Sequence, residues 1–444
     1  MSIINRWIFG LCLAFFLGMS GCSNEWQDLP STNEFGEFGD RPFPLRQDWL
    51  VVSTPKAPVT KWFEAGLPPL TALDLPPNQW NNDQKAFFAE KTSNNILNCK
   101  SLPTEEKITF AKGLTKYFGT MRQPKIEPIT EEMKPMIEDL HLEPETLATG
   151  GLLFESYCST CHGSTGAGDG PAGKFLIPLP RDYRQGLFKF LTAQPQNFGA
   201  KPQRVDLKHT IQYGMVGAGM PAFYLEENQI EAIISYVIFL SIRGECEYST
   251  MKNSLKDGVD DYAGEITSAL KRILPRWWES NKQPMKLDEN PYADEHPQRA
   301  YEKKLISAAL GYKVFLDGKK GACTTCHVNY GRSSPYQYDS WGTVVQPRNL
   351  MVGILRAGRE DHQIYARILG GIPGSGMPSH AHLIPKSDET GVLITPKQHP
   401  LWNVVHFVQA LGDVKMKSQI QQFDYMKKLF EKYEMGDPVQ VKFD

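Results

Sequence analysis

The chain has 444 residues, of which 41% are hydrophobic, and its formal net charge at pH 7 is −2. A chain of this length and composition can bury substantial cores and typically forms two or three domains. A general nucleic-acid-binding protein would show a basic excess or long runs of Lys and Arg, and the sequence has neither. We therefore expect no nucleic-acid partner.

The N-terminus has the layout of an export signal. Arg6 precedes the apolar run WIFGLCLAFFLGM, and the small residues SGC follow it. The run is shorter than the roughly 20 apolar residues that a membrane-spanning helix needs, so we expect residues 1–21 to be cleaved. The stretch LGMSGC resembles a bacterial lipobox, in which the cysteine becomes the first mature residue and carries lipid.

The lipobox resemblance implies that Cys22 is acylated. Acyl chains would tether an exported protein to the periplasmic face of a bacterial membrane. The alternatives are an ordinary signal peptide, or an uncleaved anchor, in which Cys22 has no special role.

Residues 22–127 form an N-terminal extension without a chemical motif. Its first part is polar, rich in Pro and Gly and without periodicity, which is typical of a tether. Helices are expected at about 81–97 and 105–119. We assign no function to this extension.

The first motif lies within residues 128–247. Apolar residues at helical spacing in LATGGLLFESYC lead to the motif Cys158-Ser-Thr-Cys161-His162. Irregular chain broken by Gly and Pro follows, and then EENQIEAIISYVIFLSIRG, which predicts an amphipathic helix ending at Gly244. Long irregular segments in compact domains usually mean that something functional organises them.

The same order returns within residues 296–444. A linker, residues 248–295, comes first, and one helix is expected there at about 262–274. The helical pattern AYEKKLISAALGYKVF then precedes a second Cys-x-x-Cys-His motif at Cys323, Cys326 and His327, and PLWNVVHFVQALG predicts the late helix. The final pattern VKMKSQIQQFDYMKKLFEKY predicts a helix that packs on this second domain rather than on a membrane.

The order Cys-x-x-Cys-His is typical of c-type haem attachment. Two cysteine thiols form thioethers with the two vinyl groups of the haem, and the following histidine can ligate the iron. The alternatives are a zinc site built from both cysteine pairs, a thioredoxin-like redox pair or a disulfide. Because a histidine follows in both copies of an exported chain, we expect two covalently bound haem c groups, held by Cys158, Cys161, His162, Cys323, Cys326 and His327.

Each motif is followed by a Gly-x-Gly-Met-Pro stretch, YGMVGAGMPAF in the first copy and GGIPGSGMPSH in the second. A flexible loop of this kind can place a thioether sulfur over the open face of a haem, so Met220 and Met377 are the expected distal ligands. Alternatively, these methionines could simply fill gaps in a core. The rival residues are Met215 for the first loop, and His362, His380 and His382 for the second.

With these motifs, residues 128–245 and 296–412 resemble tandem class I cytochrome c domains. The resemblance implies an all-α fold, with two small helical haem domains in which the first and last helices cross. The residues that look like the two crossings are Gly151, Phe154 and Tyr236, and Gly311, Phe315 and Phe407.

The same resemblance places a proline-arginine loop beside the haem propionates. It implies that Arg181 and Arg348 take that place, unless they are ordinary surface arginines. The second copy departs from the first because it lacks Gly after His327 and carries SHAHLIPKSDETGVLITPKQ after its methionine. This insertion puts the shape of the second haem edge in doubt, but not its ligands.

The pattern CHGSTGAGDGPAG resembles cytochrome c domains of bacterial respiratory chains. Histidine and methionine together fill both axial positions of the iron, which leaves one-electron transfer. We therefore expect a membrane-anchored dihaem electron carrier, rather than a stand-alone enzyme. Its redox partners would be a quinol-oxidising complex or other donor, and a terminal oxidase or small soluble cytochrome. The alternatives are a dihaem enzyme, such as a peroxidase or sulfur-compound oxidoreductase, and a structural or sensory haem lipoprotein.

Two cysteines remain without a role, Cys99 and Cys246. In an oxidising compartment two leftover thiols tend to pair, so we predict a disulfide that staples the N-terminal extension to the first domain. The alternative is two buried free cysteines.

Overall fold

The computed structural model describes residues 40–51, 96–176, 178–193, 201–319, 321–334, 337–340, 344–385 and 399–443. The predicted export signal and Cys22 lie outside these ranges, as does nearly all of the helix expected at 81–97. Among the described helices, none combines the length and the hydropathy that crossing a bilayer requires.

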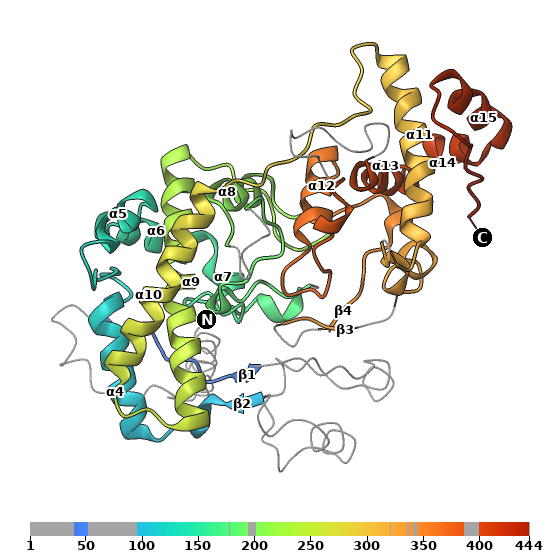
Figure 1. Cartoon of the computed structure of the whole chain (residues 1–444). Coiled ribbons are helices and arrows are strands. Elements are labelled where there is room, and N and C mark those ends of the chain that lie inside the picture. The colour runs from blue at the N-terminus through green and yellow to red at the C-terminus, as the bar shows by residue number, and fades with distance from the viewer. Residues whose placement is uncertain are drawn as a thin grey trace, which may run out of the picture.

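The described chain is mostly helical, as predicted, and forms two helical halves (Figure 1). The first half contains β1 (Trp49–Val51), β2 (Ile96–Asn98), α4 (Thr104–Phe118), α5 (Met133–Asp139), α6 (Pro144–Tyr157), α7 (Ser159–His162), α8 (Arg204–Tyr213), α9 (Glu227–Asp257) and α10 (Tyr262–Lys282). The second contains α11 (Pro297–Leu316), β3 (Gln337–Tyr338), β4 (Val344–Val345), α12 (Asp361–Gly370), α13 (Pro400–Gly412), α14 (Val414–Gln421) and α15 (Phe423–Lys432).

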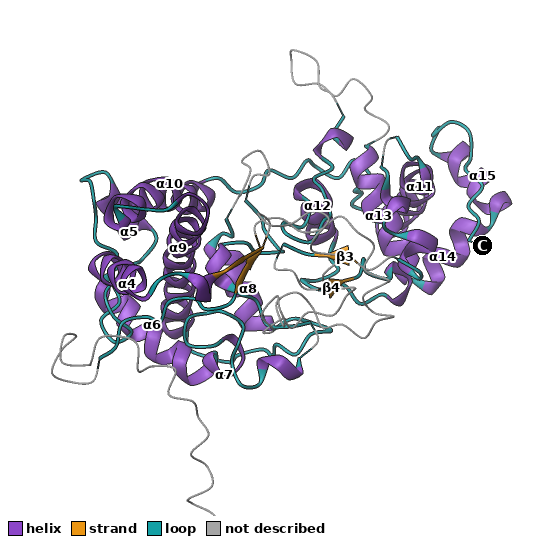
Figure 2. Ribbon diagram, turned by 90° about the horizontal axis from the view of Figure 1, so that it is seen from below, coloured by secondary structure: helices purple, strands orange, loops and turns teal. Residues whose placement is uncertain are grey.

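The strands form two small antiparallel ladders. β1 pairs with β2, with Trp49 opposite Asn98. β3 pairs with β4, with Gln337 opposite Val345. Figure 2 shows the β3–β4 ladder between the two helical halves.

Each half has its own hydrophobic core. The first core runs from Phe43 in the N-terminal extension to Trp277 in α10, and the second runs from Tyr292 to Val441. The described part of the extension, including the predicted helix α4, therefore packs on the first half. So does α10, which lies in the segment expected to be a linker and contacts α4, α5 and α9.

A close helix crossing organises each core, and a glycine makes both crossings possible. A Cβ atom built at Gly150 in α6 would overlap the carbonyl oxygen of Ala232 in α9, and one at Gly311 in α11 would overlap that of Asn403 in α13. The crossing glycine of the first half is therefore Gly150 and not the predicted Gly151, which faces the ring of Tyr236.

The predicted aromatic pairs lie at these crossings. The ring centroids of Phe154 and Tyr236 are 5.4 Å apart, and those of Phe315 and Phe407 are 5.2 Å apart. Aromatic contacts at this spacing add to the burial energy of the rings. Both halves thus repeat the same glycine-and-aromatic contact.

Helix α9 does not end at Gly244 as predicted. It continues to Asp257. Gly244 does not end the helix but lets the backbone of Arg184 pack closely against it, since a Cβ atom at this position would overlap that backbone. Similarly, α10 continues past Pro275 to Lys282, and the buried Trp277 explains its extension, since its Nε1 donates to Glu245 at 2.8 Å.

The C-terminal pattern forms two helices, α14 and α15, separated at Gln422. Both contact α11, so this segment packs on the second half as predicted. The last residues continue across the same core, where Phe443 packs on Tyr330 with ring centroids 5.1 Å apart.

An ionic network with two buried arginines, Arg46 and Arg184, fastens the N-terminal extension to the first half. Asp48 Oδ2 accepts from Arg46 and from Arg184, both at 2.9 Å, and the backbone N–H of Arg46 donates to Glu247 of α9 at 2.6 Å. Burial raises the pKa of Asp48, but the charges of Arg184 and Arg46 outweigh it and hold that pKa well below its usual range.

Candidate haem-binding sites

The first Cys-x-x-Cys-His motif forms one tight helical turn. Helix α6 ends at Tyr157, and α7 begins at Ser159, so Cys158 joins the two helices. The His162 N–H donates to the Cys158 carbonyl at 2.9 Å, and Gly163, with φ of 71°, ends the turn. This local fold brings both thiols and the histidine to one short segment, as attachment to a single planar group requires.

The ring of His162 is held in a fixed orientation. Its Nδ1 lies 3.2 Å from the carbonyl oxygen of Arg181, and its ring stacks on Tyr183 with centroids 4.8 Å apart. Burial lowers the pKa of His162 to about 4, which keeps the imidazole neutral. A neutral imidazole that donates from Nδ1 presents Nε2 as a metal ligand.

The second motif repeats this arrangement. Its His327 N–H donates to the Cys323 carbonyl at 2.8 Å, and His327 Nδ1 lies 3.2 Å from the carbonyl oxygen of Arg348. Burial also lowers the pKa of His327. Both predicted arginines thus place a backbone carbonyl behind the motif histidine.

The two motifs differ on either side of this shared core. In the second copy no glycine follows the histidine, and Asn329 and Tyr330 adopt left-handed φ values of 47° and 59° instead. The ring of Tyr330 stacks on Phe315 with centroids 6.0 Å apart. Packing of this aromatic ring offsets a backbone conformation that non-glycine residues rarely adopt.

The two Gly-x-Gly-Met-Pro loops have the same backbone turn. The Met215 N–H donates to the Met220 carbonyl at 3.0 Å, and the Ile372 N–H donates to the Met377 carbonyl at 3.0 Å. The side chains of Met220 and Met377 pack against the cores of their own halves. Met215 corresponds in this turn to Ile372, which has no sulfur, so the shared feature of the two loops is the predicted methionine.

The rival histidines of the second half lie in three different settings. His380 is buried, with Nε2 3.1 Å from the carbonyl oxygen of Gly321, whereas His382 is exposed. The backbone of His380 occupies the place of Phe223 in the first half, since the two N–H groups donate to Ile368 and Ile211 respectively, each at 3.0 Å.

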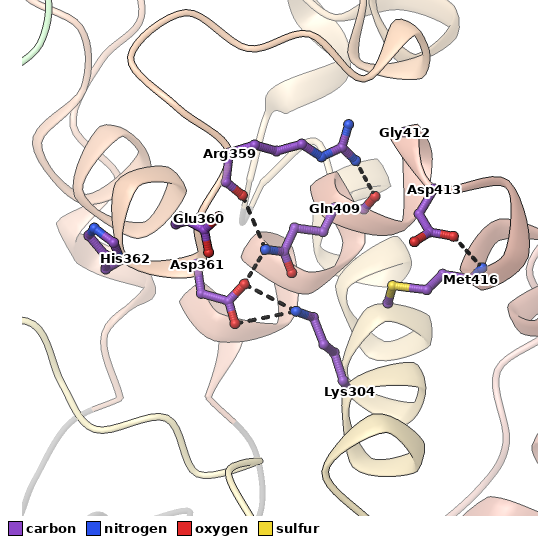
Figure 3. Close-up of a pocket in the computed structure, with 9 residues that line it drawn as sticks. All are labelled: Lys304, Arg359, Glu360, Asp361, His362, Gln409, Gly412, Asp413 and Met416. Atoms are coloured by element: carbon purple, nitrogen blue, oxygen red, sulfur yellow. Dashed lines mark hydrogen bonds and ion pairs between the residues drawn. The ribbon is translucent and has the colours of Figure 1, made fainter. Parts of the chain in front are cut away.

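His362 lines an open pocket of about 640 Å³ near the start of α12 (Figure 3). The other lining residues are mostly charged or polar, and Lys304 contacts Asp361 at 3.1 Å. The lining contains no motif cysteine, motif histidine or loop methionine. This pocket therefore belongs to neither motif.

The cysteine geometry gives the zinc alternative no site. Within the described ranges, no three His, Cys, Asp or Glu side chains gather as a metal site would require, so the four motif cysteines do not converge. Burial raises the pKa of Cys158 to about 12 and that of Cys323 to about 11. These thiols lie in apolar surroundings, and the two pairs belong to separate halves.

The residues around both motifs fit an apolar planar group. Large apolar side chains are exposed beside each motif, in the chain between the motif and the methionine loop, or in the methionine loop itself. They are Tyr157, Phe175 and Val216 in the first half, and Val328, Val352 and Ile354 in the second. An apolar surface of this kind is what a haem would cover on binding.

Three charged residues that no sequence pattern indicated lie at the junction of the halves: Lys189, Asp339 and Arg356. Lys189 Nζ lies 3.1 Å from Asp339 Oδ2. Asp339 and Arg356 are also the charges of the second half that act on Arg181, whose pKa burial lowers to about 10. These three residues belong to no motif, so only the fold brings them together.

The structure does not form the predicted disulfide: Cys99 and Cys246 are both buried and unpaired in it. Glu247 turns toward Arg46 and the extension, where Cys99 lies. Cys246, one residue earlier on α9, points about 100° away from Glu247 and lies near Arg272 of α10. The predicted helix end at Gly244 had left Cys246 outside the helix, whereas α9 continues past it to Asp257.

Comparison with known proteins gives a match within the first half. Residues 145–237 match the family model of cytochrome c oxidase, cbb3-type, subunit III. No curated protein matches the chain. Among solved structures, the Kuenenia stuttgartiensis reducing HAO-like protein complex Kustc0457/Kustc0458 aligns with a TM-score of 0.39 at 20% identity, over 60% of this chain and 96% of that one. The segment 145–237 is a cytochrome c domain, and through Cys158 and Cys161 the protein is a c-type cytochrome with at least one haem c.

Proposed function

We propose that the protein is a dihaem c-type cytochrome that carries single electrons, with residues 296–444 forming a second cytochrome c domain. The observation that carries this proposal is the repeated contact behind the motif histidine. In both halves its Nδ1 lies 3.2 Å from the carbonyl oxygen of the predicted arginine. The matching helix crossings and methionine loops support the same conclusion.

Each half would hold one haem with its own residues. Cys158 and Cys161 would form the thioethers of the first haem, and Cys323 and Cys326 those of the second. The proximal ligands would be His162 and His327, and the distal ligands Met220 and Met377. The bound iron supplies reversible one-electron oxidation and reduction.

The protein residues set how that chemistry is used. The Arg181 and Arg348 carbonyls orient the histidine rings, and the buried surroundings keep these rings neutral. If Met220 and Met377 also hold the iron of their own half, as the histidines would, no ligand position would remain for a substrate. The matched methionine loops therefore favour electron transfer over a peroxidase or sulfur-compound oxidoreductase, which would need an open position.

We place this carrier on the periplasmic face of a bacterial membrane, attached through lipid on Cys22. This part of the proposal rests on the LGMSGC stretch. The donor would be a quinol-oxidising complex or another reductant, and the acceptor a terminal oxidase or a small soluble cytochrome.

The mass of the mature full-length protein tests the proposal. The expected mass includes two haems that remain attached after extraction with acidified organic solvent, because thioether bonds do not dissociate. A mass with one haem would limit the function to the domain at 145–237. Rapid turnover of peroxide by the fully loaded protein would instead favour the enzyme alternative.

A further inference from the structure

Charged side chains from both halves meet at their junction. Arg181 and Lys189 belong to the first half, and Arg356 and Asp339 to the second. The Lys189 and Asp339 side chains, in contact at 3.1 Å, are only 14% and 1% exposed. Both Arg181 and Lys189 interact electrostatically with Asp339 and Arg356. A charge cluster this well buried is part of the fold rather than a chance surface contact.

This junction borders both candidate haem sites. Asp339 directly follows the strand β3, and its neighbour Ser340 donates its N–H to the Gly374 carbonyl in the Met377 loop at 2.7 Å. On the other side, a Cβ atom built at Gly217 in the Met220 loop would lie 3.5 Å from Ile354 and 3.7 Å from the Arg348 guanidinium. The first half therefore contacts the second beside the Met377 loop, through Lys189 and Asp339. The second half approaches the Met220 loop of the first through Ile354 and Arg348.

The cluster has the character of an anion site. Burial lowers the pKa of Lys189, and the charges of Arg181 and Arg356 lower it further, although Asp339 acts in the opposite direction. Within the described part of the chain, the buried Nε of Arg356 has no hydrogen-bond partner. A buried guanidinium nitrogen without a partner is costly, so an additional acceptor is expected here.

We propose that the positive groups of Lys189, Arg356, Arg181 and Arg348 form one carboxylate-binding junction that the propionates of both haems share, with Asp339 as the buried counter-ion of Lys189. This inference rests on the proposed function, because it needs a haem in each half. The role of the junction is to set the two reduction potentials together, since a charge placed between both sites acts on both. Sequence motifs specify each haem separately, whereas Lys189, Arg356 and Asp339 connect them.

Substitutions that remove charges of opposite sign test whether the junction acts on both haems. Lys189→Met removes a positive charge, so it should lower both reduction potentials, because ferric iron carries one more positive charge than ferrous iron. Asp339→Asn removes a negative charge and should raise both. Lys189→Arg keeps the charge and should restore values near those of the wild type. The measurement is a spectroelectrochemical titration of the full-length, haem-loaded protein.

Lys134→Met is the matched control. It removes the same charge from an exposed ion pair, in which the Lys134 side chain is 53% exposed and the Glu131 side chain 87%. Water and salt screen a charge at such a position, so neither reduction potential should shift. If Lys189→Met folds poorly, Arg356→Gln takes its place and should lower both potentials.

The mass of every variant is measured first, so that the two proposals can fail separately. A wild-type protein with one haem would overturn the proposed function. Two haems with a shift in only one potential, or in neither, would overturn the shared junction and leave the dihaem function standing.

Discussion

The Nδ1 atom of His162 lies 3.2 Å from the carbonyl oxygen of Arg181, and this contact recurs at 3.2 Å between His327 and Arg348. The partners are 19 residues apart in the first half and 21 in the second, so loops of different length reach the same end point. A carbonyl behind the ring fixes its tautomer and orientation. The repeat of this contact, more than the repeat of the motif, makes the second site comparable to the first.

Each motif should attach one haem independently. The double substitution Cys323→Ala and Cys326→Ala should remove one haem from the mature protein, since no thiol of the second motif remains to form a thioether. The mass should fall by one haem, and haem absorbance per polypeptide by about half. Cys246→Ala is the control and should keep both haems; loss of both in the double variant would contradict independent attachment.

The distal ligands can be assigned with single substitutions. Met220→Leu or Met377→Leu should remove the far-red band of sulfur-bound ferric iron from one haem and lower its reduction potential, because loss of the thioether favours ferric iron. Met215→Leu is the control for the first loop, since its counterpart Ile372 shows that the turn needs no sulfur there. An unchanged band in Met220→Leu together with a lost band in Met215→Leu would reverse the assignment.

The sequence predicted the parts of the sites that a local pattern encodes. The motifs, the methionine loops and the helices that flank them are contiguous stretches, and the structure gives them matching geometry. Gly244 is a position where a local pattern is ambiguous. A glycine after an amphipathic pattern can mark either the end of a helix or a close contact with another segment. Only the fold shows that the Arg184 backbone lies against it.

Residues that act through distant partners could not be predicted. Lys189 and Asp339 are 150 positions apart, and neither lies in a recognisable pattern. The crossing glycine of the first half was predicted one position too late, at Gly151 instead of Gly150, for a related reason. Two adjacent glycines fit the same helical pattern, and only the approach of Ala232 distinguishes Gly150.

The crossing glycines should be essential for stability. Gly150→Ala or Gly311→Ala would force a Cβ atom into a backbone carbonyl of the facing helix, so each should lower the free energy of unfolding by about 1 to 3 kcal/mol or more. Gly318→Ala is the control, because a Cβ there meets nothing within 4 Å. Denaturant unfolding of the haem-loaded variants measures the effect, and equal stability of Gly150→Ala and Gly318→Ala would contradict the crossing.

The ionic network at Asp48 predicts a dependence of stability on pH. Because the folded pKa of Asp48 is depressed, its contribution is present above the pKa of the unfolded carboxyl, about 3.9, and is lost as pH falls through the folded pKa. Asp48→Asn should therefore lower the free energy of unfolding at pH 7 by about 1 to 2 kcal/mol, a value reduced because the Asp48 side chain is 37% exposed.

The difference between wild type and Asp48→Asn should shrink as the pH falls below about 4. Glu131→Gln, at an exposed pair, is the control and should change the free energy of unfolding by less than about 1 kcal/mol. Urea unfolding at pH 7 and at acid pH measures both variants. A difference that stays constant down to the lowest pH would exclude Asp48 as the titrating group.

The two remaining cysteines should be present as thiols that only unfolding exposes. Burial raises the pKa of Cys99 to about 12, and raises that of Cys246 well above its usual value, so neither should react with iodoacetamide at pH 8 in the folded protein. After unfolding without reductant, both should be alkylated, while the motif cysteines stay blocked as thioethers. Peptide mapping by mass spectrometry measures the labels. A peptide in which Cys99 and Cys246 are cross-linked would restore the disulfide and would require α9 to turn relative to the N-terminal extension, because Glu247, and not Cys246, faces Arg46.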